Sequence, residues 1–395
     1  MKSSFNTINC RRNDGSVKWQ RFIEQCPKVE EGIIPFTLAD CDFEHPKELR
    51  EGLQNYLDTM VFGYTIPTKK YYDSVKSWFF RRHHWELDEK SILHSPGVLP
   101  AISNSIQAFT KEQDSILILS PVYYPFKRII ESLNRNVTEV NLIYENGVYN
   151  LDENSLEKAI QQNKVRVIIL CSPHNPIGKV WKREELEVIV ELCVKYNILI
   201  IDDEIHHDLI MPGHQHLCLP TLSEEAKART ILLTSTSKSF NLAGLRTSIV
   251  IIENDELRSK YENYARHMES GILSVNAFGL KATEIAYNEC GDWLDSFILH
   301  IFENHKLVKV FFETNLPQIH VLPLEGTYLQ WIDFNQLNLD EEQLVDRMEK
   351  LSNVYCDHGK LFGANGKGFF RMNLAYPQDI IINALKRIEK EFKVN

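Results

Sequence analysis

Several features that would place the chain in a special class are missing from its 395 residues. No run of about 18 consecutive apolar residues occurs, which argues against a transmembrane helix, and the first residues lack the apolar core of a secretory signal. The 8 cysteines include no CxxC pair, a pattern typical of reduced thiols rather than of a disulfide framework. We therefore expect a soluble, cytoplasmic protein that is not bound to a membrane.

Positive charge is also in deficit. The chain has 44 Lys and Arg against 54 Asp and Glu, a formal net charge of −10. This balance argues against a general surface for polyanions, so we expect no nucleic-acid partner. Low-complexity segments, linkers and fixed-period repeats are absent as well, and the domain borders must come from the pattern of predicted elements.

Short apolar runs alternate with helical patterns between about residues 92 and 252. The runs are continuous and rich in β-branched residues, as expected for strands that are covered on both faces. They are SILIL (115–119), VRVIIL (165–170), ILIID (198–202), TILLTS (230–235) and TSIVII (247–252). Apolar residues from Leu186 to Val194 recur at helical spacing and predict a crossover helix. The pattern predicts an α/β domain around a mostly parallel sheet.

The pattern changes after Asn276 to long helical segments separated by short strands, such as TYLQWIDF at 327–334. An apolar stripe from Ile381 to Phe392 predicts a C-terminal helix. Because the chain exceeds the size at which one core keeps growing, we expect a second, smaller α+β domain that the N-terminal segment completes. The predicted bounds are 1–45 for that segment, 46–285 for the large domain and 286–395 for the small domain.

Polar residues follow three of the predicted strands, where ligands of parallel sheets bind. Asn175 lies in the turn CSPHNPIG after one strand, and Asp203 directly follows another. Lys238 and Arg246 lie in TSKSFNLAGLR after a third. Taken singly, these residues also suit a turn, a helix cap and solvated charges. Together, a lysine capable of imine chemistry, an acid and a phosphate-binding arginine are the groups that pyridoxal phosphate requires.

Two further segments fit the same cofactor. HSPGVLPAI (94–102) leads into a helical pattern, so the backbone N–H groups of Val98 and Leu99 would lie at a helix N-terminus, where phosphates bind. SPVYYPF (120–126) offers Tyr123, whose flat ring could stack on a pyridine.

A metal site in DDEIHHD (202–208) is the main alternative interpretation of this region. Adjacent histidines point in different directions and no HExxH spacing supports them, so we expect no metal. Asp202, Glu204, His207 and Asp208 are then hydrogen-bonding or surface groups. The STSK segment also matches the SxxK motif of serine β-lactamases, but the chain has no KTG or KSG partner for it.

With these residues identified, the chain resembles the fold-type-I pyridoxal-phosphate enzymes of the class I/II aminotransferase superfamily. It is most similar to the MalY/PatB-type cystathionine β-lyases and cystalysin-like C–S lyases, and the resemblance covers essentially the whole chain. It is carried, in family order, by LADCDF, FGYT, PGVLPAI, SPVYYPF, PHNPIGKVW, DEIHHDL, TSTSKSFNLAGLR and FFRMNLAYP. The fold implied is aspartate-aminotransferase-like: a large domain with a mostly parallel seven-stranded sheet, plus a smaller α+β domain formed by both termini.

The resemblance also assigns roles around the cofactor ring. Lys238 would hold the cofactor as a Schiff base and later shuttle the proton. Asp203 would keep the pyridine nitrogen protonated, with its own pKa lowered by roughly 1 to 3 units beside that cation. Asn175 would hydrogen-bond the phenolic oxygen of the ring, and Tyr123 would stack on it. His206 is typical of the lyase branch, because many related aminotransferases carry tyrosine there.

Further roles concern the phosphate and the substrate. The phosphate would be bound by Val98, Leu99, Ser235, Ser237 and Arg246 of one subunit and by Tyr64 of the other, which implies a homodimer with shared sites. The substrate would contact Arg371, which grips its α-carboxylate, together with Ala39, Asp40 and Tyr123. Cys41 and Leu38 depart from the family pattern around Asp40, and we derive no substrate preference from them.

The activity implied is α,β-elimination of L-cystathionine and related S-conjugates of L-cysteine, giving pyruvate, ammonia and a thiol. An aminotransferase with the same cofactor residues is the alternative, since these motifs separate the two activities poorly. A regulatory protein that keeps the cofactor only as a ligand is a third possibility, against which the complete set of Lys238, Asp203 and Arg371 argues.

Overall fold

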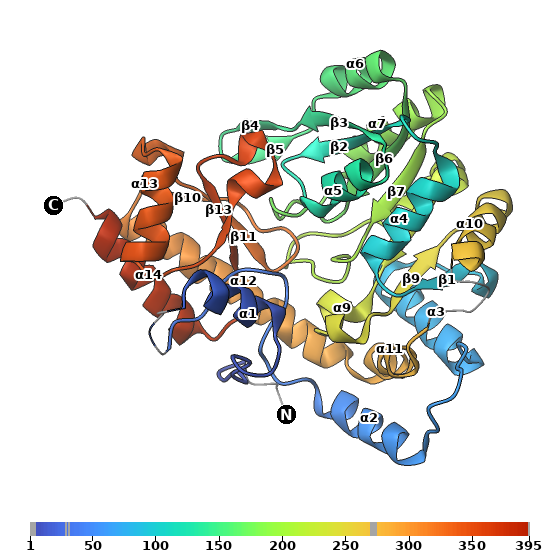
Figure 1. The fold of residues 1–395 in the computed structure, drawn as a ribbon, viewed down its shortest axis with the longest axis horizontal. Helices are drawn as coiled ribbons and strands as arrows, with labels where there is room; N and C mark the ends of the chain where they lie inside the picture. The colour runs from blue at the N-terminus through green and yellow to red at the C-terminus, as the bar shows by residue number, and fades with distance from the viewer. Residues whose placement is uncertain (1–4, 28–29, 31, 269–274, 394–395) are drawn as a thin grey trace.

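A seven-stranded, mostly parallel sheet forms the centre of the molecule (Figure 1). The computed structural model describes residues 5–27, 30, 32–268 and 275–393. The strand order is β1-β9-β8-β7-β6-β2-β3, and β9 alone runs antiparallel to its neighbours. The strands are β1 (Ile92–Ser95), β2 (Ser115–Ser120), β3 (Asn136–Asn141), β6 (Val165–Cys171), β7 (Leu199–Asp203), β8 (Thr230–Thr234) and β9 (Ser248–Ile251). All five strands predicted from apolar runs are confirmed, as is the predicted sheet.

Helices cover both faces of this sheet, which explains why its strands are apolar on both sides. One face packs on α4 (Val98–Phe109), α5 (Pro125–Ser132) and α10 (Asp255–Met268). The other packs on α6 (Glu153–Asn163) and α7 (Arg183–Lys195). The predicted crossover helix is α7, whose buried residues Leu186, Ile189 and Cys193 are the ones that recur at helical spacing.

A four-stranded antiparallel sheet of order β10-β11-β13-β12 lies beside the first (Figure 1). Its strands are β10 (His320–Val321), β11 (Leu329–Asp333), β12 (Asp357–His358) and β13 (Phe369–Asn373). It shares one apolar core with α12 (Gly291–Asn315) and α14 (Gln378–Phe392). The predicted strand within 327–334 and the predicted C-terminal helix are confirmed as β11 and α14.

The N-terminal segment packs against this second sheet. The backbone N–H of Phe36 donates to the Tyr355 carbonyl at 2.8 Å, and that of Asn373 in β13 donates to the Phe36 carbonyl at 2.9 Å. Helix α1 (Val17–Gln25) brings Trp19 and Phe22 into a small cluster with Tyr355. These contacts suit a small domain built from both ends of the chain, while the bounds 1–45, 46–285 and 286–395 stay a prediction.

The remaining elements connect and cover these layers. They are α2 (Lys47–Thr59), α3 (Lys69–His83), α8 (Glu224–Arg229), α9 (Thr236–Ser239), α11 (Ala277–Glu289), α13 (Glu341–Val345), β4 (Ile143–Glu145) and β5 (Val148–Asn150). Among the residues that the structure describes, no helix combines the length and the apolar character needed to cross a membrane.

Candidate active site

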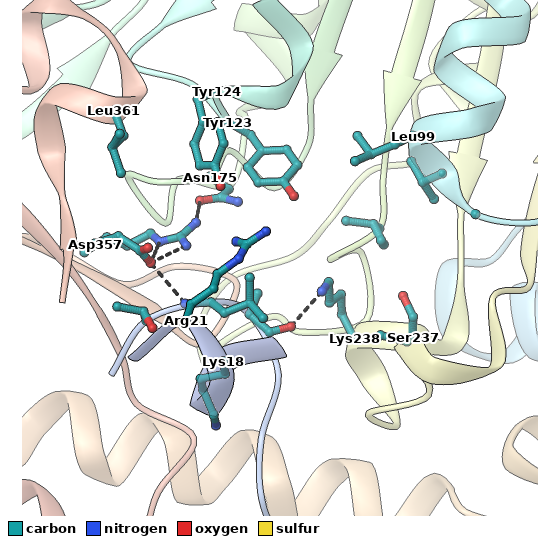
Figure 2. Close-up of a pocket in the computed structure, with 18 of the residues that line it drawn as sticks. Lys18, Arg21, Leu99, Tyr123, Tyr124, Asn175, Ser237, Lys238, Asp357 and Leu361 are labelled. Carbon is teal, nitrogen blue, oxygen red and sulfur yellow. Dashed lines mark hydrogen bonds and ion pairs between the residues drawn. The ribbon is translucent and has the colours of Figure 1, made fainter. Parts of the chain in front are cut away.

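A cavity of about 910 Å³ lies at the carboxyl ends of the central parallel strands, where the loops after β2, β6, β7 and β8 meet α1 and β13. Figure 2 shows Tyr123 and Asn175 pointing into this space from one side and Lys238 from another. The cavity is lined by every predicted site residue except Asp40 and Tyr64: Ala39, Val98, Leu99, Tyr123, Asn175, Asp203, His206, Ser235, Ser237, Lys238, Arg246 and Arg371. Segments far apart in sequence therefore converge on one site.

Lys238 lies on the short helix α9, which follows β8 directly. Ser235 starts this helix, because its Oγ accepts the N–H of Ser237 at 3.0 Å. The Lys238 Nζ donates to the Ala39 carbonyl oxygen at 2.6 Å, which fixes the amine at the cavity wall. Burial, with a smaller contribution from Arg371, lowers the pKa of Lys238 to about 8, although the carboxylates of Asp40 and Asp203 act in the opposite direction. The uncharged amine is therefore about a tenth of the total at pH 7, far more than an unperturbed lysine provides.

Asp203 is the last residue of β7 and is 3% exposed. Its Oδ1 accepts the backbone N–H of Ile205 at 3.1 Å. Burial raises the pKa of Asp203 to about 7, although this hydrogen bond and Lys238 pull the pKa down. From the sequence, we expected a lowered pKa for Asp203 when a pyridinium cation lies beside it. The protein groups alone raise the pKa of Asp203 instead. A cationic ring at this position would be stabilised by the buried carboxylate.

Arg371 and Asn175 form a fixed pair on the wall of the cavity. The Arg371 Nη1 donates to the Asn175 Oδ1 at 2.8 Å, so the amide NH₂ of Asn175 is left as a donor. On its other side Arg371 donates to Asp357 Oδ2, from Nη2 at 2.5 Å and from Nε at 3.2 Å. One N–H on each of Nη1 and Nη2 remains unused by these contacts, which is the geometry for a bidentate grip on a carboxylate.

The start of α4 forms a cradle for an anion. Gly97 precedes the helix with a φ of 153°, and no side chain caps the N-terminus. A Cβ at this glycine would approach the Pro100 side chain to 3.3 Å, so the backbone conformation and the space both favour glycine. Arg246 also lines the cavity, and its guanidinium has no ion pair among the residues that the structure describes. Unpaired N–H groups and a free cation suit a phosphate.

Ser235 lies on the cavity wall, and its hydroxyl is engaged in hydrogen bonds within the protein. Its hydroxyl lines the cavity but donates to the Thr247 carbonyl oxygen at 2.7 Å while accepting the N–H of Ser237. A phosphate would therefore compete with an existing hydrogen bond. The role predicted for Ser235 stays a prediction, and Ser237 lines the cavity beside it.

Tyr123 and His206 are two of the aromatic residues that line the cavity. Burial raises the pKa of Tyr123 to about 12, so its hydroxyl stays neutral. Burial also lowers the pKa of His206 well below its usual value, and the cations of Lys238 and Arg371 add to this effect. The His206 Nδ1 is buried and has no hydrogen-bond partner. The neutral imidazole of His206 therefore lines the cavity with Asp203, and its Nδ1 is available for a hydrogen bond with a ligand.

Asp40 and Tyr64 do not line the cavity. Asp40 forms ion pairs with Lys18 at 3.2 Å and Arg11 at 3.1 Å, and only the carbonyl of its neighbour Ala39 reaches Lys238. Tyr64 is 98% exposed in the single chain. Contact of Asp40 with substrate, and of Tyr64 with a cofactor, stays a prediction.

The sequence reasoning missed Asp357, Tyr124 and Arg128. Asp357 orients Arg371, but only the pairing of β12 with β13, in which Asp357 faces Arg371, reveals their proximity. Tyr124 follows Tyr123 and lines the cavity, and the Arg128 guanidinium lies 4.7 Å above its ring one helical turn later. That spacing in SPVYYPFKR is the one sequence signal that could have identified the pair.

The lining groups together fit a phosphorylated pyridine aldehyde. An amine can bond the aldehyde, a buried carboxylate can face the ring nitrogen, an amide donor can reach the ring oxygen, and the α4 cradle with Arg246 can bind the phosphate. These are the groups that pyridoxal phosphate requires. The fit rests on the unpaired Arg246, the fixed amide of Asn175 and the glycine cradle, each observed in this structure.

Comparisons with known proteins point the same way. The family model "Aminotransferase class I and II" matches residues 33–388. Cystathionine beta-lyase PatB of Bacillus subtilis (strain 168) is 36% identical over 386 residues, which cover 98% of this chain and 99% of the relative. Protein MalY of Escherichia coli (strain K12) is 29% identical over 392 residues, covering 97% of this chain and 99% of MalY.

Two solved structures show the same fold over their whole length. Cystalysin from Treponema denticola, which contains a pyridoxal 5′-phosphate cofactor, matches with a TM-score of 0.96 and 40% identity, covering 100% of this chain and 99% of cystalysin. The PLP-bound C–S lyase from Staphylococcus hominis matches with a TM-score of 0.90 and 25% identity, covering 99% of this chain and 98% of the lyase.

Proposed function

Because the chain belongs to the aminotransferase class I and II family, we propose that it is a pyridoxal-phosphate-dependent carbon–sulfur β-lyase. It cleaves L-cystathionine and related S-conjugates of L-cysteine to pyruvate, ammonia and a thiol. The observation that carries the proposal is the convergence of Lys238, Asp203 and the Arg371–Asn175 pair on one cavity. The names of PatB, a cystathionine beta-lyase, and of the C–S lyase from Staphylococcus hominis support the lyase over the aminotransferase.

The cofactor would be held by Lys238, Asp203, Asn175, Tyr123 and the α4 cradle with Arg246. When bound, pyridoxal phosphate supplies an electron sink that stabilises negative charge at the substrate Cα. Asp203 favours a protonated ring nitrogen because a buried carboxylate needs a cation beside it. The Asn175 NH₂ can donate to the ring oxygen, since Arg371 already occupies its Oδ1.

Arg371 positions the substrate by its α-carboxylate. Asp357 and Asn175 hold the guanidinium plane from two sides and leave one N–H on each terminal nitrogen for the carboxylate. Because the partners are themselves fixed, the arginine loses little freedom when the substrate binds. The amino acid is thereby oriented with its Cα toward Lys238.

Lys238 moves the proton in this proposal. Its Nζ takes the proton from the substrate Cα, and a pKa of about 8 leaves enough neutral amine to act as a base. The Ala39 carbonyl, which accepts from Nζ at 2.6 Å, orients the amine for this transfer. The sulfur leaves from the β-carbon as a thiolate, and the lysine ammonium lies in the same cavity to return a proton.

The deciding experiment is incubation of the purified, cofactor-loaded protein with L-cystathionine alone. We expect steady release of pyruvate and thiol without any added keto acid. Turnover that depends on a keto acid would replace the lyase by an aminotransferase, and the absence of turnover on amino acids would leave only a cofactor-binding protein.

We further propose that the chain acts as a homodimer in the cytoplasm, with the partner subunit's Tyr64 reaching the phosphate. Support comes from the segment between α2 and α3, where Val61, Phe62, Tyr64 and Ile66 are 86%, 79%, 98% and 69% exposed in the single chain. Apolar side chains exposed together mark an interaction surface. The 8 cysteines are all free, as suits a reducing compartment.

A complementation experiment tests the shared site. Tyr64→Ala and Lys238→Ala variants are each expected to be weakly active or inactive. Mixing and reassociating them should restore activity, because the mixed dimer contains one site with both residues intact. Sedimentation should show a dimer, and an active monomer would contradict the assembly.

A further inference from the structure

The active-site cavity extends beyond the groups that the proposed reaction uses. It is also lined by Arg21 of α1, which points into it in Figure 2, and by Arg128 of α5. Both arginines are exposed in the single chain, so they lie where the cavity opens to solvent. Neither guanidinium forms an ion pair or a side-chain hydrogen bond within the described part of the chain. The nearby acid Glu349 is occupied, because it pairs with His358 at 2.6 Å.

The other lysines and arginines that line the cavity already have a partner or a role. Lys18 pairs with two carboxylates at 3.0 and 3.2 Å. Lys238 and Arg246 face the space for the cofactor, and Arg371 is held by Asp357 in the geometry for an α-carboxylate. Two cations therefore remain at the mouth of the cavity after the cofactor and the reacting end of the substrate are accounted for.

Stacking on an aromatic ring holds Arg128 in place. Its guanidinium carbon lies 4.7 Å from the centroid of the Tyr124 ring, which precedes it by one helical turn. The Tyr124 ring packs against the Phe362 ring, with centroids 6.0 Å apart. The guanidinium carbon of Arg371 in turn lies 4.7 Å from the centroid of Phe362. Arg371 and Arg128 therefore lie at the two ends of one row of aromatic rings.

This row limits the distance that a ligand must span. Its three contacts place the guanidinium carbons of Arg371 and Arg128 no more than about 15 Å apart. The two carboxyl carbons of an extended L-cystathionine are roughly 9 Å apart, and a guanidinium–carboxylate pair adds about 4 Å at each end. The substrate is therefore long enough to reach both arginines, and its flexible methylene groups allow it to bend where the separation is smaller.

The wall of the cavity also suits the methylene groups of such a ligand. Tyr124 and Leu361 both line the cavity, and Leu361 is 47% exposed although it is apolar. Contact with the carbon chain between the sulfur and the far carboxylate would remove apolar surface of both side chains from water. A cationic end and an apolar wall together fit an aliphatic arm that ends in an acid.

We propose that Arg128, together with Arg21, binds a carboxylate on the thiol half of the substrate. The protein then selects S-conjugates of L-cysteine whose leaving thiol carries an acid, such as L-cystathionine, over conjugates with a plain alkyl arm. This inference rests on the proposed lyase function and narrows its substrate class. Because the chain as a whole carries a net charge of −10, these two arginines supply a local attraction that the rest of the surface does not give an anionic arm.

The test compares two substrates that differ only at the far end of the arm. S-(3-carboxypropyl)-L-cysteine is cystathionine without its distal amine, and S-butyl-L-cysteine has a methyl group in place of the carboxylate. Both release a primary alkanethiol, so the arm changes binding and not the leaving group. With the cofactor-loaded wild-type protein we expect kcat/KM to be about 10-fold higher for the acid, and this preference should shrink at high salt. Equal values for the two substrates would overturn the proposal.

Matched variants assign the preference to the two arginines. Arg128→Met keeps an unbranched chain on the Tyr124 ring but removes the charge, and we expect the preference for the acid to fall by about 5-fold. The double variant with Arg21→Met should abolish it. Lys127→Met is the control, because this neighbour on α5 carries the same charge but pairs with Glu139 of β3 at 2.6 Å. An unchanged preference in the double variant, or its loss in Lys127→Met, would contradict the assignment.

The same preference can be measured without turnover. Titration of each substrate into the cofactor-loaded protein, followed by the absorbance of the cofactor, gives dissociation constants even for a protein that releases no pyruvate. A failure of the lyase proposal would appear as absent pyruvate with tighter binding of the acid retained. A failure of the present inference would appear as equal binding of the acid and the butyl compound, whether or not pyruvate is released.

Discussion

The segment from the end of β7 onward places an acid and a histidine on each of its two sides, but the pKa values of these groups are shifted in opposite directions. On the active-site side, burial raises the pKa of Asp203 to about 7, and burial with nearby cations lowers that of His206. On the reverse side, burial would lower the pKa of His207, but Asp208 and Glu204 raise it to about 9. Burial would likewise raise the pKa of Asp208, yet His207 and His83 hold it well below its usual range.

The comparison shows how neighbours decide what a buried group can do. The reverse side pairs acids with imidazoles and satisfies most of their hydrogen bonds. The active-site side leaves Arg246 without an ion pair among the described residues and His206 Nδ1 without a hydrogen-bond partner. Burying a polar group without a partner costs free energy, and such a group is available to bind a ligand. Groups that are paired within the protein stabilise the fold instead. Substitutions on the two sides should therefore have different effects.

Removal of the amine on the active-site side should have the largest effect. Lys238→Ala is expected to lower kcat on cystathionine by at least about 10⁴-fold, because it removes both the proton-transferring group and the attachment of the cofactor. Steady-state pyruvate release measures the loss. Lys281→Ala, whose lysine pairs with Glu284 on α11, is the control and should keep its activity.

Neutralising the acid of the active site should come next. Asp203→Asn keeps the shape but removes the charge that favours a protonated ring nitrogen, and we expect kcat to fall by about 10²–10³-fold. The folded protein should tolerate the change, since a neutral amide escapes the cost of burying a charge. Kinetics and urea unfolding of the same preparation check both points. A large loss of stability with normal kcat would show that Asp203 stabilises the fold and does not act in catalysis.

The matching change on the reverse side should act mainly on stability. Asp208→Asn leaves His83, Trp78 and Ser239 with a poorer acceptor and leaves the His207 cation unbalanced. We expect the free energy of unfolding to fall by about 3 kcal/mol, as when one partner of a buried ion pair is removed. Urea denaturation gives this value. A decrease in kcat larger than that of Asp203→Asn would show that the two sides are not separate.

A smaller effect is expected when the guanidinium group of Arg371 is replaced by an amine. Arg371→Lys keeps the positive charge but loses the bidentate geometry and the bond to Asn175. We expect KM for cystathionine to rise by roughly 10-fold or more, since a good bidentate pair contributes about 1.5–3 kcal/mol. An unchanged KM would place the substrate carboxylate elsewhere in the cavity.

The smallest expected effect is a pH dependence in protein freed of its cofactor. The pKa of Lys238 is lowered from 10.5 to about 8, so the folded state is penalised while this lysine is charged. The unfolded chain binds the extra proton between these pKa values, and this contribution to stability therefore rises from pH 8 to 10.5. We expect a gain of about 1–3 kcal/mol relative to Lys238→Met, because water in the cavity screens the charge. Urea unfolding at both pH values measures it.

The features that the sequence predicted well follow from short-range patterns. Continuous β-branched runs predicted the five strands, because a strand covered on both faces must be apolar throughout. Asn175, Asp203 and Lys238 were placed in one site because the ends of neighbouring parallel strands meet at one edge of a sheet.

Contacts that depend on register and long-range packing could not be predicted in this way. Asp357 meets Arg371 only through the pairing of β12 with β13. His83 reaches His207 because α3 packs beside the loop after β7, a contact that no local pattern encodes. The ion pairs of Asp40 with Lys18 and Arg11 likewise depend on packing that the sequence pattern does not encode, and its contact with substrate stays a prediction. Asp202, Glu204, His207 and Asp208 were expected to be hydrogen-bonding or surface groups. The structure buries all four, and Glu204, His207 and Asp208 make hydrogen bonds there.

The most direct test of the central claim is to find the lysine that carries the cofactor. Borohydride reduction of the purified holoprotein, followed by proteolysis and mass spectrometry, locates the covalent attachment. The account predicts a phosphopyridoxyl group on Lys238, in the peptide that contains TSKSFN. A modification on any other lysine, or none on a protein that still releases pyruvate from cystathionine, would contradict it.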